Sequence, residues 1–318
     1  MQLLLFSLYK RFVIYLIILM MILNNLQSFT AHFLVALLAS CLISKRAYDK
    51  KSLSLSGSLL ALLVGFFTTL PNYGFFMCML TFFVTSSCLT NLKAKKKQKI
   101  EESYKEGGQR TARQVACNGG VAVFISVVYL IEVGCGERPI NFSKDFTTSV
   151  LITGLIGSLA CCNGDTWSSE LGTAYGGKYP RLITSWKMVP VGTNGGVTLL
   201  GLISSSLGGL AIGITFIASN YLFVFPNIGE NTLPSQWPIL LVTIYAGLVG
   251  SILDSLIGAV YQYSGYCILS KKVVSKPTPS TQHISGCDLL DNDQVNLISS
   301  ILMALTTPIV AYYLWRVY

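Results

Sequence analysis

Long apolar stretches alternate with short polar connectors along almost the whole chain. Each stretch approaches the roughly 17–25 residues that a helix needs to cross a hydrocarbon core about 30 Å thick. The predicted spans are residues 12–28, 29–44, 53–70, 73–90, 115–133, 148–163, 197–224, 238–260 and 294–315. We therefore predict an all-α fold, a polytopic transmembrane bundle of about nine spans.

The first stretch has two interpretations. Lys10 and Arg11 before the apolar run from Phe12 to Leu23 resemble a signal peptide. A second apolar stretch follows at once without a small-residue cleavage site, which favours a retained helix or helical hairpin. We predict that residues 1–50 form N-terminal membrane helices and that residues 51–318 form the main transmembrane domain.

Composition supports a membrane protein. The 318 residues are 52% hydrophobic and only 12% charged, against about 25% charged in soluble domains. The mean hydropathy of +0.58 leaves too few polar side chains to cover soluble domains. The net charge of +9 could suggest nucleic acid, but the basic residues collect in connectors instead of lining a face. The expected partner is the lipid bilayer, and we expect no nucleic acid.

Basic residues also predict the orientation of the bundle. Alternate connectors contain 20 of the 23 Lys and Arg residues, whereas the opposite connectors near residues 71–73, 134–147 and 225–237 hold only Arg138 and Lys144. The positive-inside rule then places the N-terminus and the long basic connectors in the cytosol. The glycosylation sequon at Asn141 falls in the opposite set, which indicates the endoplasmic reticulum or another endomembrane.

The cytosolic connector 163–196 carries most of the candidate chemistry. Asp165 follows a hydrophobic helix, and Glu170 lies five residues later. If this segment is helical, Asp165, Ser168 and Ser169 share a face, while Glu170 points elsewhere unless the backbone bends. Carboxylates with hydroxyls and water suit Mg²⁺, which completes its shell with phosphate oxygens.

The same connector ends in a glycine-rich turn. Its candidate phosphate-binding residues are Gly192, Thr193, Asn194, Gly195 and Gly196. Glycines let backbone amides face an anion, and the helix that follows adds a favourable dipole. Lys187 and Arg181 could neutralise phosphate charge. Alternatively, the glycines form an ordinary interfacial turn and Lys187 is one more positive-inside residue.

Asp254 lies in the middle of the apolar run AGLVGSILDSLIGAVY. A carboxylate there costs at least ~2.5–3.5 kcal/mol on insertion scales, so it indicates function. Gly250, Asp254 and Gly258 share a helix face where another helix could approach. The alternative is a structural hydrogen bond between helices.

Other polar groups lie at predicted cytosolic helix ends. Asn118 opens the fifth predicted span, and Asp291 and Asn292 open the last. These residues could complete one site, although acidic residues at a helix N-terminus can also serve as caps. The polar stretch from Ser270 to Ser285, with two prolines, predicts a loop.

Four strings carry a family resemblance: GGQRTARQVACNGGV, GDTWSSELG, PRLITSWKMVPVGTNGGVT and DNDQVNLIS. They resemble the integral membrane family that includes transmembrane protein 19 and plant phytyl-phosphate kinase, from about Lys51 to Asn296. The resemblance implies a kinase-like domain that transfers a phosphate from a nucleoside triphosphate to an isoprenoid monophosphate. A more distant similarity to polyprenol kinases implies CTP, with ATP as the alternative donor.

The resemblance also implies roles for particular residues. Asp165 would bind Mg²⁺ with support from Glu170, and Lys187 with the glycine turn would hold nucleotide phosphates. Asn118, Asp254, Asp291 and Asn292 would line the remainder of the site. The acceptor could be an isoprenoid alcohol or its monophosphate. A transporter using the intramembrane Asp254 is the alternative function, and a non-catalytic scaffold is a third.

Overall fold

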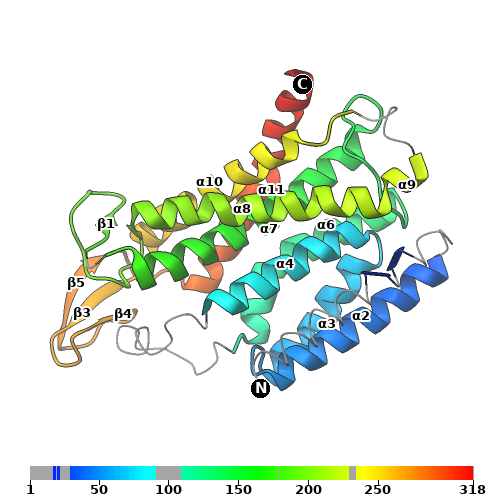
Figure 1. Cartoon of the computed structure of the whole chain (residues 1–318). Coiled ribbons are helices and arrows are strands. Elements are labelled where there is room, and N and C mark those ends of the chain that lie inside the picture. The colour runs from blue at the N-terminus through cyan, green and yellow to red at the C-terminus, as the bar shows by residue number, and fades with distance from the viewer. Residues whose placement is uncertain are drawn as a thin grey trace.

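The protein is described by a computed structural model over residues 17–18, 20–21, 29–90, 109–177, 179–228 and 234–317. Its helices form one elongated bundle (Figure 1). The helices are α2 (Phe29–Asp49), α3 (Leu55–Thr69), α4 (Tyr73–Thr90), α6 (Ala112–Glu132), α7 (Phe146–Tyr175), α8 (Leu199–Phe223), α9 (Phe225–Ile228), α10 (Pro238–Tyr261) and α11 (Asn292–Val317).

The predicted polytopic helical fold is confirmed. Every predicted span from 29–44 onward coincides with a helix, and seven of the described helices are long and apolar enough to cross a membrane. The helix α3, with 15 residues, is shorter than that threshold. The first predicted span, 12–28, lies almost entirely outside the described residues. The count of about nine is therefore slightly high for the part of the chain that the structure describes.

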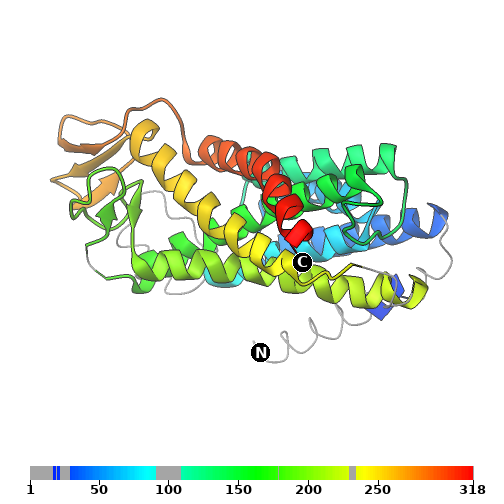
Figure 2. The same cartoon turned by 90° about the horizontal axis from the view of Figure 1, so that it is seen from above.

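Two small sheets lie together at one end of the bundle (Figures 1 and 2). The first pairs β1 (Arg181–Leu182) with β2 (Gly196–Val197), antiparallel. The second has the order β4-β3-β5 and is also antiparallel. Its strands are β3 (Ser264–Cys267), β4 (Lys272–Val274) and β5 (Thr281–Ser285). The prediction of a loop over 270–285 was wrong, because β4 and β5 within this polar stretch pair with the preceding β3.

Helix α7 forms the centre of the core. Ile152, Leu155, Ile156 and Leu159 on this helix are fully buried, and α7 packs against α4, α6, α8, α10 and α11. A helix surrounded in this way is apolar on all sides. The carboxylate at its polar end is therefore enclosed by neighbouring helices.

Glycines let α7, α8 and α10 cross with their backbones in contact. A Cβ atom built on Gly164 of α7 would lie 2.7 Å from the Cα atom of Gly247 on α10 and 2.8 Å from the carbonyl oxygen of Ser205 on α8. Small residues at such crossings are typical of membrane helix packing. Because Asp165 follows Gly164 directly, this crossing brings Asp165 against α10, the helix that carries Asp254.

Candidate functional site

A polar cavity of about 270 Å³ lies beside this crossing, near the end of the bundle that carries the strands. Four segments form it: the C-terminal part of α7, the glycine turn with the start of α8, the C-terminal part of α10, and the start of α11. Asp165 and Asp254 both line it. Exposed Ser169 and Asn292 stand at its rim, so the cavity opens to solvent.

A hydroxyl group holds each carboxylate. Ser251 Oγ donates to Asp165 Oδ1 at 3.2 Å, and Ser299 Oγ donates to Asp254 Oδ2 at 3.3 Å. The two carboxylates are close enough to interact electrostatically. Two adjacent negative charges in a largely enclosed site repel each other, and a bound cation removes that repulsion.

The amide of Asn296 extends this polar group to α6. Its side chain lies between Asp254 Oδ2 and Asn118 Oδ1, with one amide atom 3.1 Å from each. An orientation with the amide nitrogen toward Asp254 also lets it donate to the carbonyl oxygen of Asn292 at 3.1 Å. The amide therefore connects the carboxylate site to Asn118.

The glycine turn is anchored to the end of α10 and to β3. Gly195 has a φ of +76°, and a Cβ atom on it would lie 2.4 Å from the Cβ atom of Ala259. The backbone N–H of Asn194 donates to Ser264 Oγ at 3.0 Å. All five predicted residues of the turn, from Gly192 to Gly196, line the cavity. The fixed turn thus lies on the same cavity as both carboxylates.

The backbone amides of the turn are only partly available to an anion. Thr193 N donates to the carbonyl of Pro190 at 3.3 Å, and Gly196 N donates to the carbonyl of Thr193 at 3.0 Å. Within the described residues, the amides of Gly192 and Gly195 make no such bond. The N-terminus of α8 begins after Thr198, which also lines the cavity. Free backbone amides and a helix N-terminus are groups that suit an anion, so this side of the cavity is the candidate anion-binding side.

Glu170, the second predicted metal ligand, is not among the residues that line the cavity. The helix α7 continues without interruption to Tyr175. Five residues along a regular helix turn a side chain by about 140° from Asp165. Ser168 and Ser169 share the face of Asp165 and line the cavity, as the helical interpretation predicted. The second carboxylate that lines the cavity is that of Asp254.

The predicted cations Lys187 and Arg181 are also absent from the cavity lining. Both side chains are exposed, in the hairpin that joins β1 to the glycine turn. Arg181 Nη1 donates to the carbonyl oxygen of Trp186 at 2.9 Å, which ties this guanidinium to its own hairpin. Among the described lining residues there is no Lys or Arg, so their positive charge is not part of the cavity wall.

Asp291 caps a helix instead of lining the cavity. Its Oδ1 accepts from the backbone N–H of Gln294 at 3.1 Å, and its Oδ2 accepts from Arg113 Nη2 at 2.5 Å. The neighbouring Asn292 does line the cavity. The capping alternative therefore describes Asp291 in this structure.

Sequence reasoning missed the groups that orient the carboxylates. Ser251 and Ser299 lie in apolar helices, where serine commonly bonds to the backbone of its own helix. Ser251 lies three residues before Asp254, a spacing that places both on one helix face. That spacing could have identified Ser251 from the sequence. No local sequence feature identifies Ser299, or Gln262, which lines the cavity as well.

The side chains present fit a hard cation. Within the described residues, no group of three or more His, Cys, Asp and Glu gathers that could hold a metal. The cavity instead offers two carboxylates with neutral hydroxyl and amide oxygens. Mg²⁺ usually takes one or two protein carboxylates and fills its shell with water and phosphate oxygens.

Comparison with known proteins places the chain in a family. Residues 38–304, most of the chain, match the family described as integral membrane protein DUF92. The chain belongs to this family. The comparison confirms the predicted membership in an integral membrane family, while the likeness to transmembrane protein 19 and the kinase activity stay predictions.

Similar proteins include two from a plant and one from an archaeon. Protein PGR of Arabidopsis thaliana is 40% identical over 280 residues, which are 88% of this chain and 96% of that protein. "Protein VTE6, chloroplastic" of Arabidopsis thaliana is 30% identical over 226 residues, 70% of this chain and 61% of that protein. An uncharacterized membrane protein, MJ0933 of Methanocaldococcus jannaschii, is 24% identical over 279 residues, 87% of this chain and 91% of that protein. No solved structure matches the chain.

Proposed function

We propose that this protein is a membrane-embedded kinase that transfers a phosphate from a nucleoside triphosphate to an isoprenoid or long-chain lipid monophosphate. The observation that carries the proposal is that Asp165 and Asp254, from different helices, line one cavity with the glycine turn. The resemblance of the four motif strings to the phytyl-phosphate kinase family supports the same reaction class.

Phosphoryl transfer suits these groups because it needs positioning and charge neutralisation more than covalent chemistry by the protein. Mg²⁺ held by Asp165 and Asp254 would neutralise charge on the phosphoryl group. Ser251 and Ser299 keep the carboxylates oriented toward the cavity, and the turn with the α8 N-terminus binds the donor phosphates. CTP and ATP are both candidate donors.

The proposal is tested with purified full-length protein in detergent, Mg²⁺, radiolabelled CTP or ATP, and a panel of prenyl alcohols and monophosphates. Labelled lipid diphosphate is the expected product. Labelled monophosphate formed from an alcohol would change the acceptor class. If no acceptor becomes labelled, and reconstituted vesicles show solute flux without nucleotide, the kinase is rejected in favour of a transporter that uses Asp254.

We further propose that the protein resides in the endoplasmic reticulum or another endomembrane, with its N-terminus and the carboxylate site on the cytosolic side. The support is the distribution of charge. Arg46 in the last turn of α2, Lys51 in the α2–α3 connector and Arg113 at the start of α6 belong to the basic set. Arg138 and Lys144 lie in the α6–α7 connector, which is at the end of the bundle opposite the strands (Figure 1). A soluble nucleotide and a lipid acceptor meet naturally at that cytosolic boundary.

A further inference from the structure

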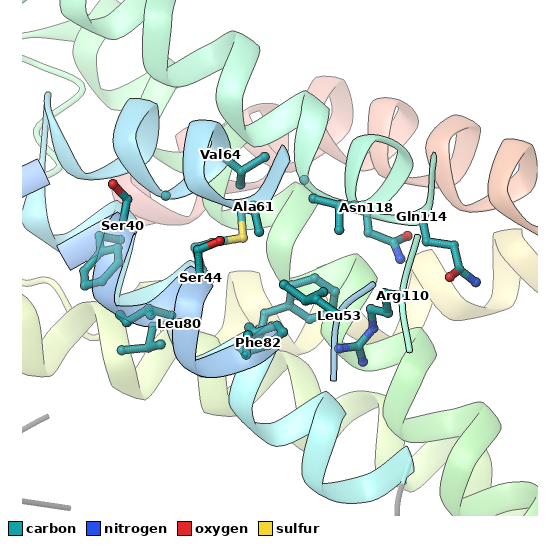
Figure 3. Close-up of a pocket in the computed structure, with 18 residues that line it drawn as sticks. Ser40, Ser44, Leu53, Ala61, Val64, Leu80, Phe82, Arg110, Gln114 and Asn118 are labelled. Carbon is teal, nitrogen blue, oxygen red and sulfur yellow. The ribbon is translucent and has the colours of Figure 1, made fainter. Parts of the chain in front are cut away.

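A second cavity lies between α2, α3, α4 and α6, and most of its lining residues are apolar (Figure 3). Val64, Met79 and Phe82 line it, and α2 contributes Ser40 and Ser44. Arg110, Gln114 and Asn118 form one end, while Ser40 and Leu80 lie toward the other (Figure 3). The cavity is thus amphipathic along its length, with a single cation at one end.

The backbone of Arg110 is fixed in place. Its N–H donates to the carbonyl of Ser52 at 3.1 Å, and its carbonyl accepts from the N–H of Ser54 at 3.0 Å. Residue Leu53 forms a β-bridge with it. This pairing anchors Arg110 to the α2–α3 connector just before α6 begins at Ala112. The guanidinium is therefore presented from a rigid support.

The charge of Arg110 has no counter-ion within the described residues. Its Nη1 donates to Ser87 Oγ at 2.8 Å, and its Cζ lies 5.8 Å from the centroid of the Phe83 ring. The described ion pairs of this region join Arg113 to Asp291 and Asp293 instead. Burial lowers the pKa of Arg110 to about 10, so the side chain stays charged at neutral pH. A largely buried cation with no opposite charge beside it is costly, and an anionic ligand offsets that cost.

The dimensions of the cavity suit the first part of a lipid chain. Its volume is about 80 Å³, roughly half that of an engineered apolar cavity of about 150 Å³ that admits benzene. A cavity of this size has room for only a few carbons next to a head group, so a longer chain has to continue outside it. Leu34, Leu37 and Leu38 on the exposed side of α2 provide an apolar surface there.

Asn118 connects the two cavities. Its side chain lines the apolar cavity and lies 3.1 Å from Asn296, a residue that lines the polar cavity. The Sγ atom of Cys162, three residues before Asp165, donates to the carbonyl of Asn118 at 3.5 Å. Asn118 on α6 is therefore a direct point of contact between the apolar cavity and the residues around the carboxylates.

We propose that the apolar cavity is the acceptor site, which holds the head-proximal part of an isoprenoid monophosphate with its phosphate on Arg110. This inference rests on the proposed kinase function and specifies its acceptor. A guanidinium binds a phosphate through paired N–H donors, whereas an alcohol offers no charge to recognise. The site accordingly selects a monophosphate over the parent alcohol.

The test measures binding of tritiated geranylgeranyl monophosphate and geranylgeraniol to the full-length protein in detergent, without nucleotide. The wild-type protein should bind the monophosphate at least ten times more tightly than the alcohol. Arg110→Gln should abolish this preference. Ala61→Phe, which fills the cavity from α3, should weaken both ligands at least ten-fold. Leu63→Phe on the exposed face of the same helix is the matched control and should change neither.

The inference is overturned if Arg110→Gln leaves the preference intact, if Ala61→Phe behaves like Leu63→Phe, or if phosphatidic acid displaces the prenyl ligand with equal potency. Should Arg110→Gln fail to fold, Arg110→Lys replaces it. The lysine keeps the charge but loses the paired donors, so the preference should fall several-fold, and an unchanged preference again overturns the site.

Activity assays separate this inference from the proposed function. Binding that follows the expected pattern in a protein that transfers no phosphate would reject the kinase and leave the lipid site standing. Transfer to a prenyl monophosphate that is unaffected by both Arg110→Gln and Ala61→Phe would reject the lipid site and leave the kinase standing.

Discussion

At the scale of single residues, Asp165 and Glu170 are a matched pair for testing the site. Both are carboxylates on the C-terminal part of α7, but only Asp165 lines the polar cavity. Asp165→Asn preserves size while removing the charge that a metal requires. We expect Mg²⁺-dependent transfer to fall about 100-fold or more in this variant.

Glu170→Gln is the control for that substitution, and it should retain transfer within a few-fold of the wild-type rate. The measurement is the initial rate of labelled lipid formation at saturating Mg²⁺. Equal losses of transfer rate in the two variants would show that any carboxylate at this end of α7 matters, whether or not it lines the cavity.

Glu137 provides a prediction that is independent of catalysis. Its Oε1 accepts from the backbone N–H of Tyr73 at 2.8 Å, at the start of α4. Burial raises the pKa of Glu137 to about 7, from a usual value of 4.5. Between these values the folded protein holds a proton that the unfolded chain releases. Stability should therefore fall by about 1 kcal/mol per pH unit from pH 4.5 to 7 and level off above.

Thermal unfolding in detergent across this pH range measures the effect. Glu137→Gln retains an oxygen that can accept from Tyr73, and it should remove this part of the pH dependence. An identical slope in the variant and the wild-type protein would assign the pH dependence to other groups.

The sequence predicted a cavity residue correctly where that residue, or a short segment, is unusual for its surroundings. Asp254 is conspicuous in an apolar helix, and the glycine turn stands out by composition. Glu170 was predicted from its nearness in sequence to Asp165, and Lys187 from its place before the glycine turn. Local helix and hairpin geometry leaves both side chains out of the cavity lining. Arg110 was part of a quoted motif, but its role depends on a cavity that only the folded bundle creates.

At the scale of secondary structure elements, the crossing of α7, α8 and α10 positions the carboxylates. Gly164→Ala places a methyl group within 3 Å of α10 and α8 backbone atoms. Overpacking of this kind costs about 1–3 kcal/mol. We expect a lower melting temperature in detergent and reduced transfer, because the helices that carry Asp165 and Asp254 must separate.

Gly120→Ala in α6 is the matched control, because a Cβ atom there meets nothing within 4 Å. It should leave stability unchanged or slightly higher. If Gly164→Ala has the same melting temperature and transfer rate as Gly120→Ala, the close approach of α7, α8 and α10 is not required for stability or transfer.

Long apolar helices were predictable from the sequence, whereas the polar end of α7 and the short strands were not. Apolar length located eight helices, because a spanning helix must be nearly continuous in hydrophobicity. The prediction for α7 ended at residue 163, whereas the helix runs to Tyr175. Its polar last turns face the cavity and its rim, so hydropathy could not include them. The strands β3, β4 and β5 are short and are set by backbone pairing, which a hydropathy pattern does not register.

At the scale of the whole molecule, the charge distribution predicts a topology. The sequon at Asn141 lies in the α6–α7 connector, at the end of the bundle opposite the polar cavity (Figure 1). Expressed in cells, the protein should carry an endoglycosidase-sensitive glycan that is lost in Asn141→Gln. A second sequon made by Trp186→Asn with Met188→Thr should stay unmodified on the cytosolic side. The reverse pattern would invert the topology.

The central claim is that Asp165 and Asp254 together hold one divalent cation. Mn²⁺ binding followed by electron paramagnetic resonance tests it most directly, since it requires no knowledge of donor or acceptor. We predict one site per chain, lost in Asp165→Asn, lost equally in Asp254→Asn, and weakened no further in the double variant. Undiminished Mn²⁺ binding in the double variant would contradict the claim.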